Sequence, residues 1–524
     1  MERAALLLAF MASLFSWGDG DDPPTELATA TAAQIRAEAS RSSSDPDGAP
    51  LPLASHWNGK PPDGVVPADL VALVEAGHHV LPAFKIDIPN LDRDAYFRKP
   101  LERARELGLP ISLVSTQWEA KLLEPRFRSL PKDETPCLVD RLGNVKPQLS
   151  PVGPIEHWHR VGQEWTGSML LARLQTWYPD PPFVLFVSNN EAPTAALGAD
   201  RRPAGSNAGF RARYARLLDG MRQGLDRSWR TKARFIGYNI QPAPEFLGRW
   251  SRWRVHARYQ DGQPMNRWTG VWDGGSAPFY THDWSKITDH TVWSPQVQAM
   301  NWVPFLERET YRRDPDWWHE ISVWDGDKNW TKKNESKRAY YRSRGQVYTA
   351  ERYRGMVQFG MWLTRPRLVR EFRHYSETAR DQSDYFRAVL ESVDRVHEDP
   401  TLRRFWRKGK LVSHPTRRHP YQVQIPPPYR DWPRWYLLET DQDPQRPWKL
   451  ETRLPVYAIA RVLGKAPERE WLLYTHSPLD EARQASVAVP GFGVAEVRAT
   501  ISGTFHLLSE TQRTVTAIAP GATR

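Results

Sequence analysis

Apolar runs and amphipathic helical patterns alternate along the chain from residue 50 to about residue 400. Short runs rich in Val, Ile, Leu and aromatic residues predict strands buried on both faces, and apolar residues at helical spacing predict the helices between them. The predicted strands cover residues 51–57, 79–84, 111–115, 183–188, 234–239, 297–302, 318–324 and 356–363. Eight strands alternating with helices over this length predict an α/β fold, the (β/α)8 TIM barrel.

The alternative architecture is an open doubly wound sheet with helices on both faces. Helices are predicted at 67–76, 94–107 and 155–177, around 210–221, at 338–352 and around 386–393. No Gly-rich phosphate-binding loop follows an early strand, which argues against a nucleotide-binding form of the doubly wound sheet.

The pattern changes after the barrel, predicted at residues 50–402. Residues 403–433 form a basic, Pro-rich connector, and residues 434–524 contain short alternating segments separated by Gly and Pro. Such short segments with turn residues between them predict a small C-terminal antiparallel β-sandwich.

The first 49 residues lie outside this pattern. A short apolar run at residues 4–15 is followed by Ser16, Trp17 and Gly18, so residues 1–18 resemble a secretory signal peptide. This run is too short for stable insertion across a membrane. Residues 19–49, rich in Ser, Asp, Pro and Ala, predict a flexible lead-in. We therefore expect a secreted or periplasmic protein.

Composition adds a preference for carbohydrate. The chain has 24 tryptophans and a formal net charge of +11. Flat aromatic faces suit sugar rings, and a basic balance favours acidic partners such as uronate or sulfated sugars. No nucleic-acid-binding signature is present, so we predict no nucleic-acid partner. The single cysteine, Cys137, excludes an intrachain disulfide, and the sequence predicts no oligomeric state.

The fourth predicted strand ends in Ser188, Asn189, Asn190 and Glu191. Chemistry in parallel barrels is done at the carboxyl ends of the strands, where a glutamate can act as a general acid and an amide can bind a sugar hydroxyl. The competing interpretation is a strand that stops in a polar turn, because Asn-Asn is also common turn sequence.

Cleavage of a glycosidic bond also needs a second carboxylate, which in retaining enzymes lies about 5–5.5 Å from the first. Glu320, on the predicted seventh strand, can supply it. It comes early in that strand, so a bulge would be needed to bring it to the rim. Four further carboxylates compete for the role: Asp325, Asp327, Glu307 and Glu309.

An Asn-Glu pair ending strand four, together with a glutamate on strand seven, resembles the clan of retaining (β/α)8-barrel glycoside hydrolases. The resemblance implies that Glu191 is the acid/base, that Asn190 binds the 2-hydroxyl of the sugar, and that Glu320 is the nucleophile. It also implies that a tryptophan on strand eight, here Trp362, forms the floor of the site. C-terminal β-sandwiches are common in that clan.

Other candidates for substrate binding follow the predicted strands. Trp302 ends the sixth, and Arg365 and Arg367 follow the eighth, where they could meet a sulfate or carboxylate. Each has a structural alternative, and for the arginines surface ion pairs are favoured. The remaining candidates follow strands one and three or lie in the excursion after strand five, residues 241–293: His56, Trp57, Trp118, Glu119, Tyr280 and His282.

Two histidine pairs, His78–His79 and His157–His159, suggest a metal site only by composition. Neighbours on a strand point to opposite faces, and residues two apart on a helix do not share a face. We therefore predict neither a catalytic metal nor a cofactor. No Gly-x-Ser-x-Gly elbow is present, which argues against a serine hydrolase.

The sequence as a whole predicts a retaining glycoside hydrolase that acts on a polysaccharide or oligosaccharide, with an anionic glycan among the candidates. The first alternative is a non-catalytic glycan-binding protein on the same barrel. A polysaccharide lyase is the second alternative, and it would need a base and a charge neutraliser beside a uronate.

Overall fold

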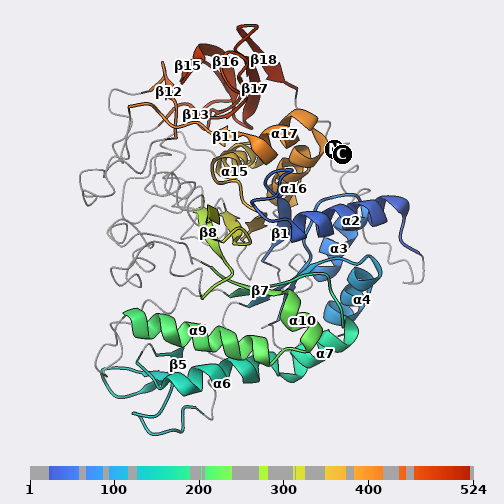
Figure 1. The fold of residues 1–524 in the computed structure, drawn as a ribbon, viewed down its shortest axis with the longest axis vertical. Coiled ribbons are helices and arrows are strands. Elements are labelled where there is room, and N and C mark those ends of the chain that lie inside the picture. The colour runs from blue at the N-terminus through green and yellow to red at the C-terminus, as the bar shows by residue number, and fades with distance from the viewer. Residues whose placement is uncertain are drawn as a thin grey trace.

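The computed structural model describes residues 23–57, 66–86, 94–115, 127–150, 152–188, 202, 207–238, 271–280, 311–312, 314–324, 349–372, 383–416, 436–443 and 454–519. In these residues the chain forms a parallel barrel and a separate C-terminal sheet, as the sequence predicts (Figure 1).

The barrel is an eight-stranded parallel sheet. In spatial order its strands are β1 (Leu53–His56), β10 (Leu368–Glu371), β9 (Trp318–Trp324), β8 (Gly274–Tyr280), β7 (Ala233–Tyr238), β6 (Val184–Ser188), β3 (Ile111–Ser115) and β2 (Ala83–Lys85). A parallel bridge between Ala54 and Val80 brings the two ends of the sheet together. The Ala54 amide donates to the His79 carbonyl and the Leu81 amide to the Ala54 carbonyl, both at 2.9 Å, which closes the barrel.

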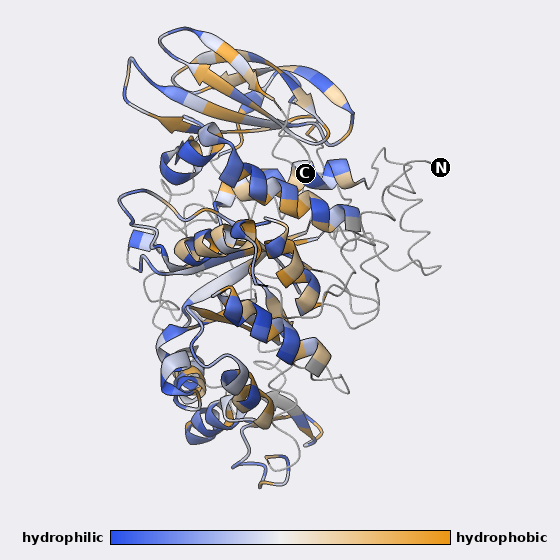
Figure 2. Cartoon of the chain, turned by 90° about the vertical axis from the view of Figure 1, so that its right-hand side faces the viewer, coloured by the Kyte–Doolittle hydropathy of each residue, from blue (hydrophilic) through white to orange (hydrophobic). Residues whose placement is uncertain are grey.

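Helices flank the barrel strands. Their bounds are α3 Pro67–Glu75, α4 Lys99–Glu106 after a π-turn at Asp94–Arg98, α6 Ile155–Thr166, α7 Met169–Trp177, α9 Asn207–Gln223, α10 Arg227–Lys232, α15 Ala350–Thr364, α16 Ser383–Glu398 and α17 Pro400–Lys408. A hairpin of β4 (Cys137–Val139) and β5 (Val145–Leu149) precedes α6. Figure 2 shows hydrophilic and hydrophobic residues alternating along these helices, as expected of helices with one face on a core.

The sixth barrel strand is not where the sequence predicts it. The strand between β7 and β9 is β8, Gly274–Tyr280, and the predicted segment 297–302 lies outside the described residues. Two glycines and Pro278 give β8 a weak strand signal, since both residue types are depleted in strands. Gly274 is required there, because a Cβ at this position would lie 2.2 Å from the carbonyl oxygen of Trp318.

The prediction of the eighth strand is also wrong. Residues 356–363 lie within helix α15, and the eighth strand is β10 at Leu368–Glu371. Almost every residue of α15 from Arg352 onward is buried, because the helix lies between the barrel and the C-terminal sheet (Figure 1). A helix buried on all sides carries an unbroken apolar run, which by periodicity resembles a buried strand.

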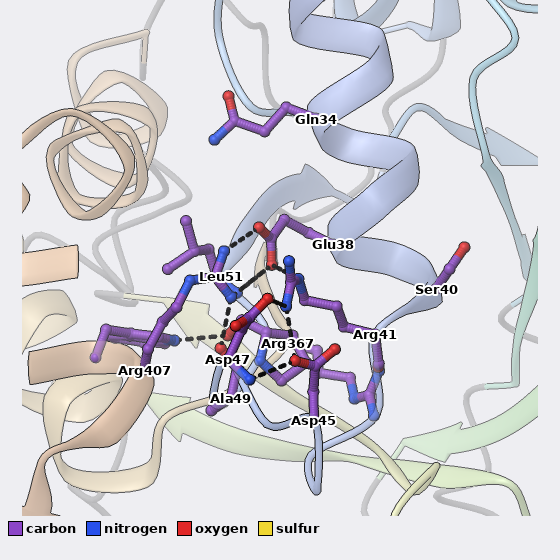
Figure 3. A network of polar contacts seen from close by, with 12 residues as sticks. Gln34, Glu38, Ser40, Arg41, Asp45, Asp47, Ala49, Leu51, Arg367 and Arg407 are labelled. Carbon is purple, nitrogen blue, oxygen red and sulfur yellow. Dashed lines mark hydrogen bonds and ion pairs between the residues drawn. The ribbon is translucent and has the colours of Figure 1, made fainter. Parts of the chain in front are cut away.

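The N-terminal segment is more ordered than predicted. Helix α2, Glu26–Ser40, begins at Thr25, whose side chain caps the Ala28 amide, and it buries Ala28, Ala32 and Ile35. A polar network then ties its C-terminal end to the barrel (Figure 3): Glu38 accepts from the Leu51 amide at 2.8 Å and pairs with Arg407 of α17. Within residues 19–49, the prediction of a flexible lead-in is therefore wrong for the helix.

The C-terminal domain is a mixed sheet with a sandwich-like curl. Its main path runs β11 (Lys410–Leu411), β13 (Tyr457–Leu463), β14 (Glu470–His476), β16 (Gly493–Thr500), β15 (Ala482–Val489) and β12 (Glu439–Thr440), and β17 (Thr504–Ser509) joins β14 to β18 (Thr514–Ile518). All of its pairings are antiparallel except the short contact of β14 with β16. Strand β11 belongs to this sheet and lies within residues 403–433, so part of the predicted connector is part of the C-terminal domain.

Candidate active site

Glu320 occupies the third position of β9, the seventh strand of the barrel, and its side chain is fully buried. Ser276 of β8 donates to Oε1 of Glu320 at 2.8 Å. Arg370 of β10 donates from Nε to the same oxygen at 2.9 Å and from Nη2 to Oε2 at 3.1 Å. Three adjacent strands therefore fix one carboxylate inside the barrel.

Arg370 is held as firmly as the carboxylate. Its Nη1 donates to Ser55 Oγ at 3.0 Å and to the His56 carbonyl at 3.4 Å, and its Nη2 donates to Ser112 Oγ at 3.1 Å. With the two bonds to the carboxylate, these contacts use all five donors of the guanidinium. Ser55 in turn donates to the Leu81 carbonyl at 2.9 Å. The guanidinium thus spans the interior between strands seven, one and three.

An aromatic cluster lies beyond this ion pair, at the carboxyl ends of the strands. Trp57, directly after β1, donates from its indole nitrogen to Ser322 Oγ at 3.1 Å, and its ring lies 5.5 Å from the Arg370 guanidinium. Phe372, directly after β10, makes edge contacts with Trp57 and with Trp324, the last residue of β9. This cluster forms an apolar floor where the mouth of a barrel would receive a ligand.

Glu320 lies below that floor. The pairing of β9 with β8 is continuous from Trp318 to Trp324, so the bulge that would lift Glu320 to the rim does not form. Because side chains alternate along a strand, Ser322 and Trp324 share its face and lie nearer the carboxyl end. Ser322, the next inward residue above Glu320, accepts the indole N–H of Trp57, and Glu320 is fully buried beneath them.

His56 faces away from the interior. Its ring makes an edge contact with Phe386 of α16 at 5.3 Å, and its Nε2 lies 3.8 Å from Oε2 of Glu371, which is also buried. Alternation along β1 explains this placement, since Ser55 points inward toward Arg370. Of the two residues predicted together here, Trp57 lies at the mouth and His56 packs against a surrounding helix.

The two candidates predicted around strand eight lie elsewhere. Trp362 packs edge-on against Trp406 and Phe505, between the barrel and the C-terminal sheet. Arg365 ends α15 and donates to the carbonyls of Trp406 and Gly409, and burial lowers its pKa. Both residues precede β10, at the amino-terminal side of the barrel, because the predicted strand is a helix. The premise for their contact with substrate is therefore wrong.

Arg367 lies on the same side, one residue before β10. It donates to the carbonyls of Arg41 and Pro315. Burial lowers its pKa as well, and its charge helps to keep His319 neutral, with a pKa of about 3.

Several predicted residues lie outside the described part of the chain: Asn190, Glu191, Trp118, Glu119, His282 and Trp302. Glu191 comes three residues after Ser188, the last residue of β6, and β6 is the fourth barrel strand as predicted. Tyr280 ends β8, paired with Trp324 across the sheet.

The pair His78–His79 makes hydrogen bonds within the protein, and His159 of the second pair lies 3.4 Å from Asp219. Nδ1 of His78 and Nδ1 of His79 contact Asp394 of α16 at 2.6 and 2.8 Å, and these contacts hold the pKa of Asp394 below its usual range. Among the residues that the structure describes, no group of three His, Cys, Asp or Glu side chains could hold a metal ion. Within the same residues, no helix is long and apolar enough to cross a membrane.

No protein-family model matches the chain, and no curated protein matches it. Among solved structures, the fold is similar to a family 26 endo-β-1,4-mannanase of Cellulomonas fimi, with 9% identity over 91% of this chain and 98% of that one and a TM-score of 0.40. A Paenibacillus polymyxa xyloglucanase from glycoside hydrolase family 44 covers 79% of this chain and 83% of its own, with 9% identity and a TM-score of 0.30. Such low scores are too weak to transfer an activity or a residue's role.

Sequence reasoning found Glu320 but missed its partners. Arg370 is a charged residue in an apolar strand, at the inward position of Leu-Val-Arg-Glu, and that pattern is a usable signal of a buried ion pair. The apolar run at residues 356–363 predicts the eighth strand ahead of Arg370, so this signal falls outside the predicted strand. Ser276 lay in a segment that was not predicted as a barrel strand.

Proposed function

We propose that this chain is a glycoside hydrolase that cleaves a polysaccharide or oligosaccharide with retention of anomeric configuration. The observation that supports it best is Glu320 on the seventh strand of a closed parallel barrel, fixed by Arg370 and Ser276. Glu191, just beyond the fourth strand, is the proposed acid/base, and Asn190 the proposed ligand of the sugar 2-hydroxyl.

In the proposed first step, a carboxylate oxygen of Glu320 bonds to the anomeric carbon while the glycosidic C–O bond breaks, and Glu191 gives its proton to the leaving oxygen. In the second step, Glu191 takes a proton from water, whose oxygen bonds to the anomeric carbon and releases the Glu320 carboxylate. Each step conserves charge, and the two carboxyl groups return to their initial states.

The hydrogen bonds of Glu320 suit a nucleophile. The guanidinium of Arg370 contacts both oxygens of the carboxylate and so fixes the position and plane of the attacking group. Oε1 accepts two of the bonds described, from Ser276 and Arg370, whereas Oε2 accepts one. Since a carboxylate oxygen has two lone pairs, Oε2 is the oxygen with room for the anomeric carbon.

The aromatic cluster of Trp57, Trp324 and Phe372 gives a sugar ring a flat apolar surface at the carboxyl ends of the strands. The formal charge of +11 favours a uronate-bearing or sulfated glycan. An anionic polysaccharide outside the cell is therefore the proposed substrate, in keeping with the predicted signal peptide.

The depth of Glu320 below the end of its strand supports two alternatives: another carboxylate as the nucleophile, or a glycan-binding protein without catalysis. Asp325 follows Trp324 directly and so comes at the end of the seventh strand in sequence. If Asp325 were the nucleophile, Glu320 and Arg370 would be a structural pair beneath it. A glycan-binding protein without catalysis is the second candidate function, because a fully buried and hydrogen-bonded ion pair also serves as core.

The test is reducing-end release by the purified protein over a panel of neutral, uronate-bearing and sulfated polysaccharides. We expect activity on one class and a loss of at least about 10³-fold in kcat for Glu191→Gln and Glu320→Gln. Glu351→Gln, on the exposed start of α15, is the control and should retain activity. The anomer released, followed by NMR, should match that of the substrate.

Three results would change the assignment. Full activity in Glu320→Gln with loss in Asp325→Asn would move the nucleophile to Asp325 and keep the enzyme. Products with an ultraviolet-absorbing double bond would identify a lyase. Binding to one glycan class without any cleavage would establish the binding protein.

A further inference from the structure

We propose that Arg370 is the positioning residue of the nucleophile, and that Ser55 and Ser112 hold it in place for that task. This inference rests on the proposed function, since it concerns how Glu320 is presented to a sugar. The sequence pattern around Arg370 signals a buried ion pair, but it assigns no role in presenting a nucleophile to Arg370, Ser55 or Ser112.

The geometry of the pair supports the inference. Arg370 lies level with Ser322 on the neighbouring strand, one inward position nearer the carboxyl end than Glu320, which is level with Leu368. The guanidinium therefore reaches back toward the amino-terminal side and meets both oxygens of the carboxylate, which fixes the plane as well as the position of the carboxyl group. A single-point donor cannot fix that plane.

The serines explain why the guanidinium stays in place. Ser55 and Ser112 come from strands one and three and engage the outer nitrogens, while the inner edge faces the carboxylate. All of these groups are fully buried, so water does not compete for the donors. A structural ion pair needs only a counter-charge, whereas this arrangement also restrains rotation of the guanidinium.

The same contacts place two hydrogen bonds on Oε1 of Glu320 and one on Oε2, so Oε2 keeps a second lone pair for attack. Ser276 and Nε of Arg370 both bond to Oε1, so the carboxylate is anchored asymmetrically. Asymmetric anchoring selects one oxygen for attack. Misplacement of a reacting atom by about 1 Å can cost about 100-fold in rate, so loss of this anchoring should appear in kcat.

The experiment compares Arg370→Lys with Arg367→Lys, using the glycan class found active for the wild-type chain. Arg367 is a matched control because it is buried just before β10 and donates to backbone carbonyls at the amino-terminal side of the barrel. Thermal unfolding, kcat and KM are measured for both variants. Ser112→Ala and Ser276→Ala are added, because each removes one hydrogen bond and retains both charges.

We expect Arg370→Lys to lose about 100-fold in kcat with little change in KM, and Ser112→Ala and Ser276→Ala to lose smaller factors in the same way. Arg367→Lys should lower the unfolding temperature but keep kcat within about twofold of wild type. Should Arg370→Lys fail to fold, the two serine variants decide, since a purely structural role would lower stability without lowering kcat.

The experiment distinguishes failure of the role of Arg370 from failure of the proposed nucleophile. An active wild-type chain whose kcat is unchanged in Arg370→Lys, or in the serine variants, overturns the role of Arg370 and leaves the glycosidase intact. A wild-type chain inactive on every glycan, or a fully active Glu320→Gln, overturns the proposed nucleophile and the role of Arg370 with it.

Discussion

Arg461, in strand β13 of the C-terminal sheet, donates from Nη2 at 2.6 Å and from Nε at 2.9 Å to the carbonyl oxygen of Trp362 in α15. This carbonyl belongs to the last turn of the helix, where no intrahelical donor is available. Arg461 also reaches the carbonyl of Gly409 at 3.2 Å. One buried cation thus joins the C-terminal sheet to the helix that packs on the barrel.

We expect Arg461→Met to lower the free energy of unfolding by about 2–3 kcal/mol, because buried carbonyls lose their donor. Urea unfolding followed by tryptophan fluorescence measures the change. Arg498→Met, on the exposed face of β16 in the same sheet, should change stability by less than about 0.5 kcal/mol. Equal losses in both variants would show that the contact between sheet and helix does not depend on Arg461.

Buried histidines should make the fold sensitive to acid. Burial and the charge of Arg367 lower the pKa of His319 to about 3, and burial lowers that of His476 to about 3. An unfolded histidine has a pKa of about 6.5, so the native state binds fewer protons below that pH. Their contribution to stability is therefore complete above about pH 6.5 and is lost as the pH falls toward 3.

Each of these histidines should lower the free energy of unfolding by about 2 kcal/mol when the pH falls from 7.5 to 5. His319→Asn cannot take up the proton, so its loss of stability between pH 7.5 and pH 5 should be smaller than that of the wild-type chain by about that amount. Urea unfolding at the two pH values gives the comparison. If the variant and the wild-type chain lose the same stability between pH 7.5 and pH 5, His319 is not a source of the acid sensitivity.

Two helices of the barrel pack backbone to backbone through glycine. A Cβ on Gly220 of α9 would lie 2.0 Å from the carbonyl oxygen of His159, and one on Gly162 of α6 would lie 2.1 Å from that of Leu217. Figure 1 shows α6 and α9 side by side, at the end of the molecule opposite the C-terminal sheet. No flexible side chain can yield at these contacts, so the helices themselves must separate to admit a methyl group.

Gly220→Ala should therefore lower the free energy of unfolding by about 2 kcal/mol, even though alanine favours a helix by about 1 kcal/mol relative to glycine. Gln163→Ala, on the exposed side of α6, is the control and should leave stability within about 0.5 kcal/mol of wild type. A stabilised Gly220→Ala would mean that the two helices are not in such close contact.

The fold class could be predicted because buried parallel strands leave a strong local signal. The bounds of β3 and β9 agree with the sequence at both ends, since each is a run of buried residues entered from Pro or from charged sequence. The prediction is wrong where a helix carries the pattern of a buried strand or a strand lacks it. Helix α15 is buried almost all round, and its apolar run at residues 356–363 predicts a strand, whereas β8 contains two glycines and a proline and gives only a weak strand signal.

The candidate site depends on relations that the sequence does not record. Glu320 could be selected from its residue type and its strand. Its contact with Arg370 depends on which strands are neighbours and how they are aligned, and the contact of Arg370 with Ser112 crosses the barrel interior. The depth of Glu320 below the end of β9 follows from an unbroken pairing, which no local pattern predicts.

The polar network at the end of α2 should stabilise the N-terminal segment against the barrel (Figure 3). Glu38 is 4% exposed and bonds to the Leu51 amide and to Arg407, while Arg41 pairs with Asp45 at 2.9 Å in the turn that follows. Removing one member of a buried ion pair leaves the other charge without compensation, at a cost of about 3–5 kcal/mol.

Glu38→Gln replaces one accepting oxygen by a donor and removes the charge, so we expect a loss of about 3 kcal/mol in the free energy of unfolding. The C-terminal end of α2 depends on this ion pair, while the rest of the helix is held by its buried apolar residues and by the hydrogen bonds of Gln34 to His79 and His397. The same variant should therefore be cut faster by protease within residues 26–48. Glu26→Gln, exposed in the first turn of the same helix, removes an equal charge without a buried partner and should cost less than about 1 kcal/mol. If both variants resist protease as the wild-type chain does, the buried apolar residues and the hydrogen bonds of Gln34 hold the helix, and the ion pair of Glu38 with Arg407 contributes little.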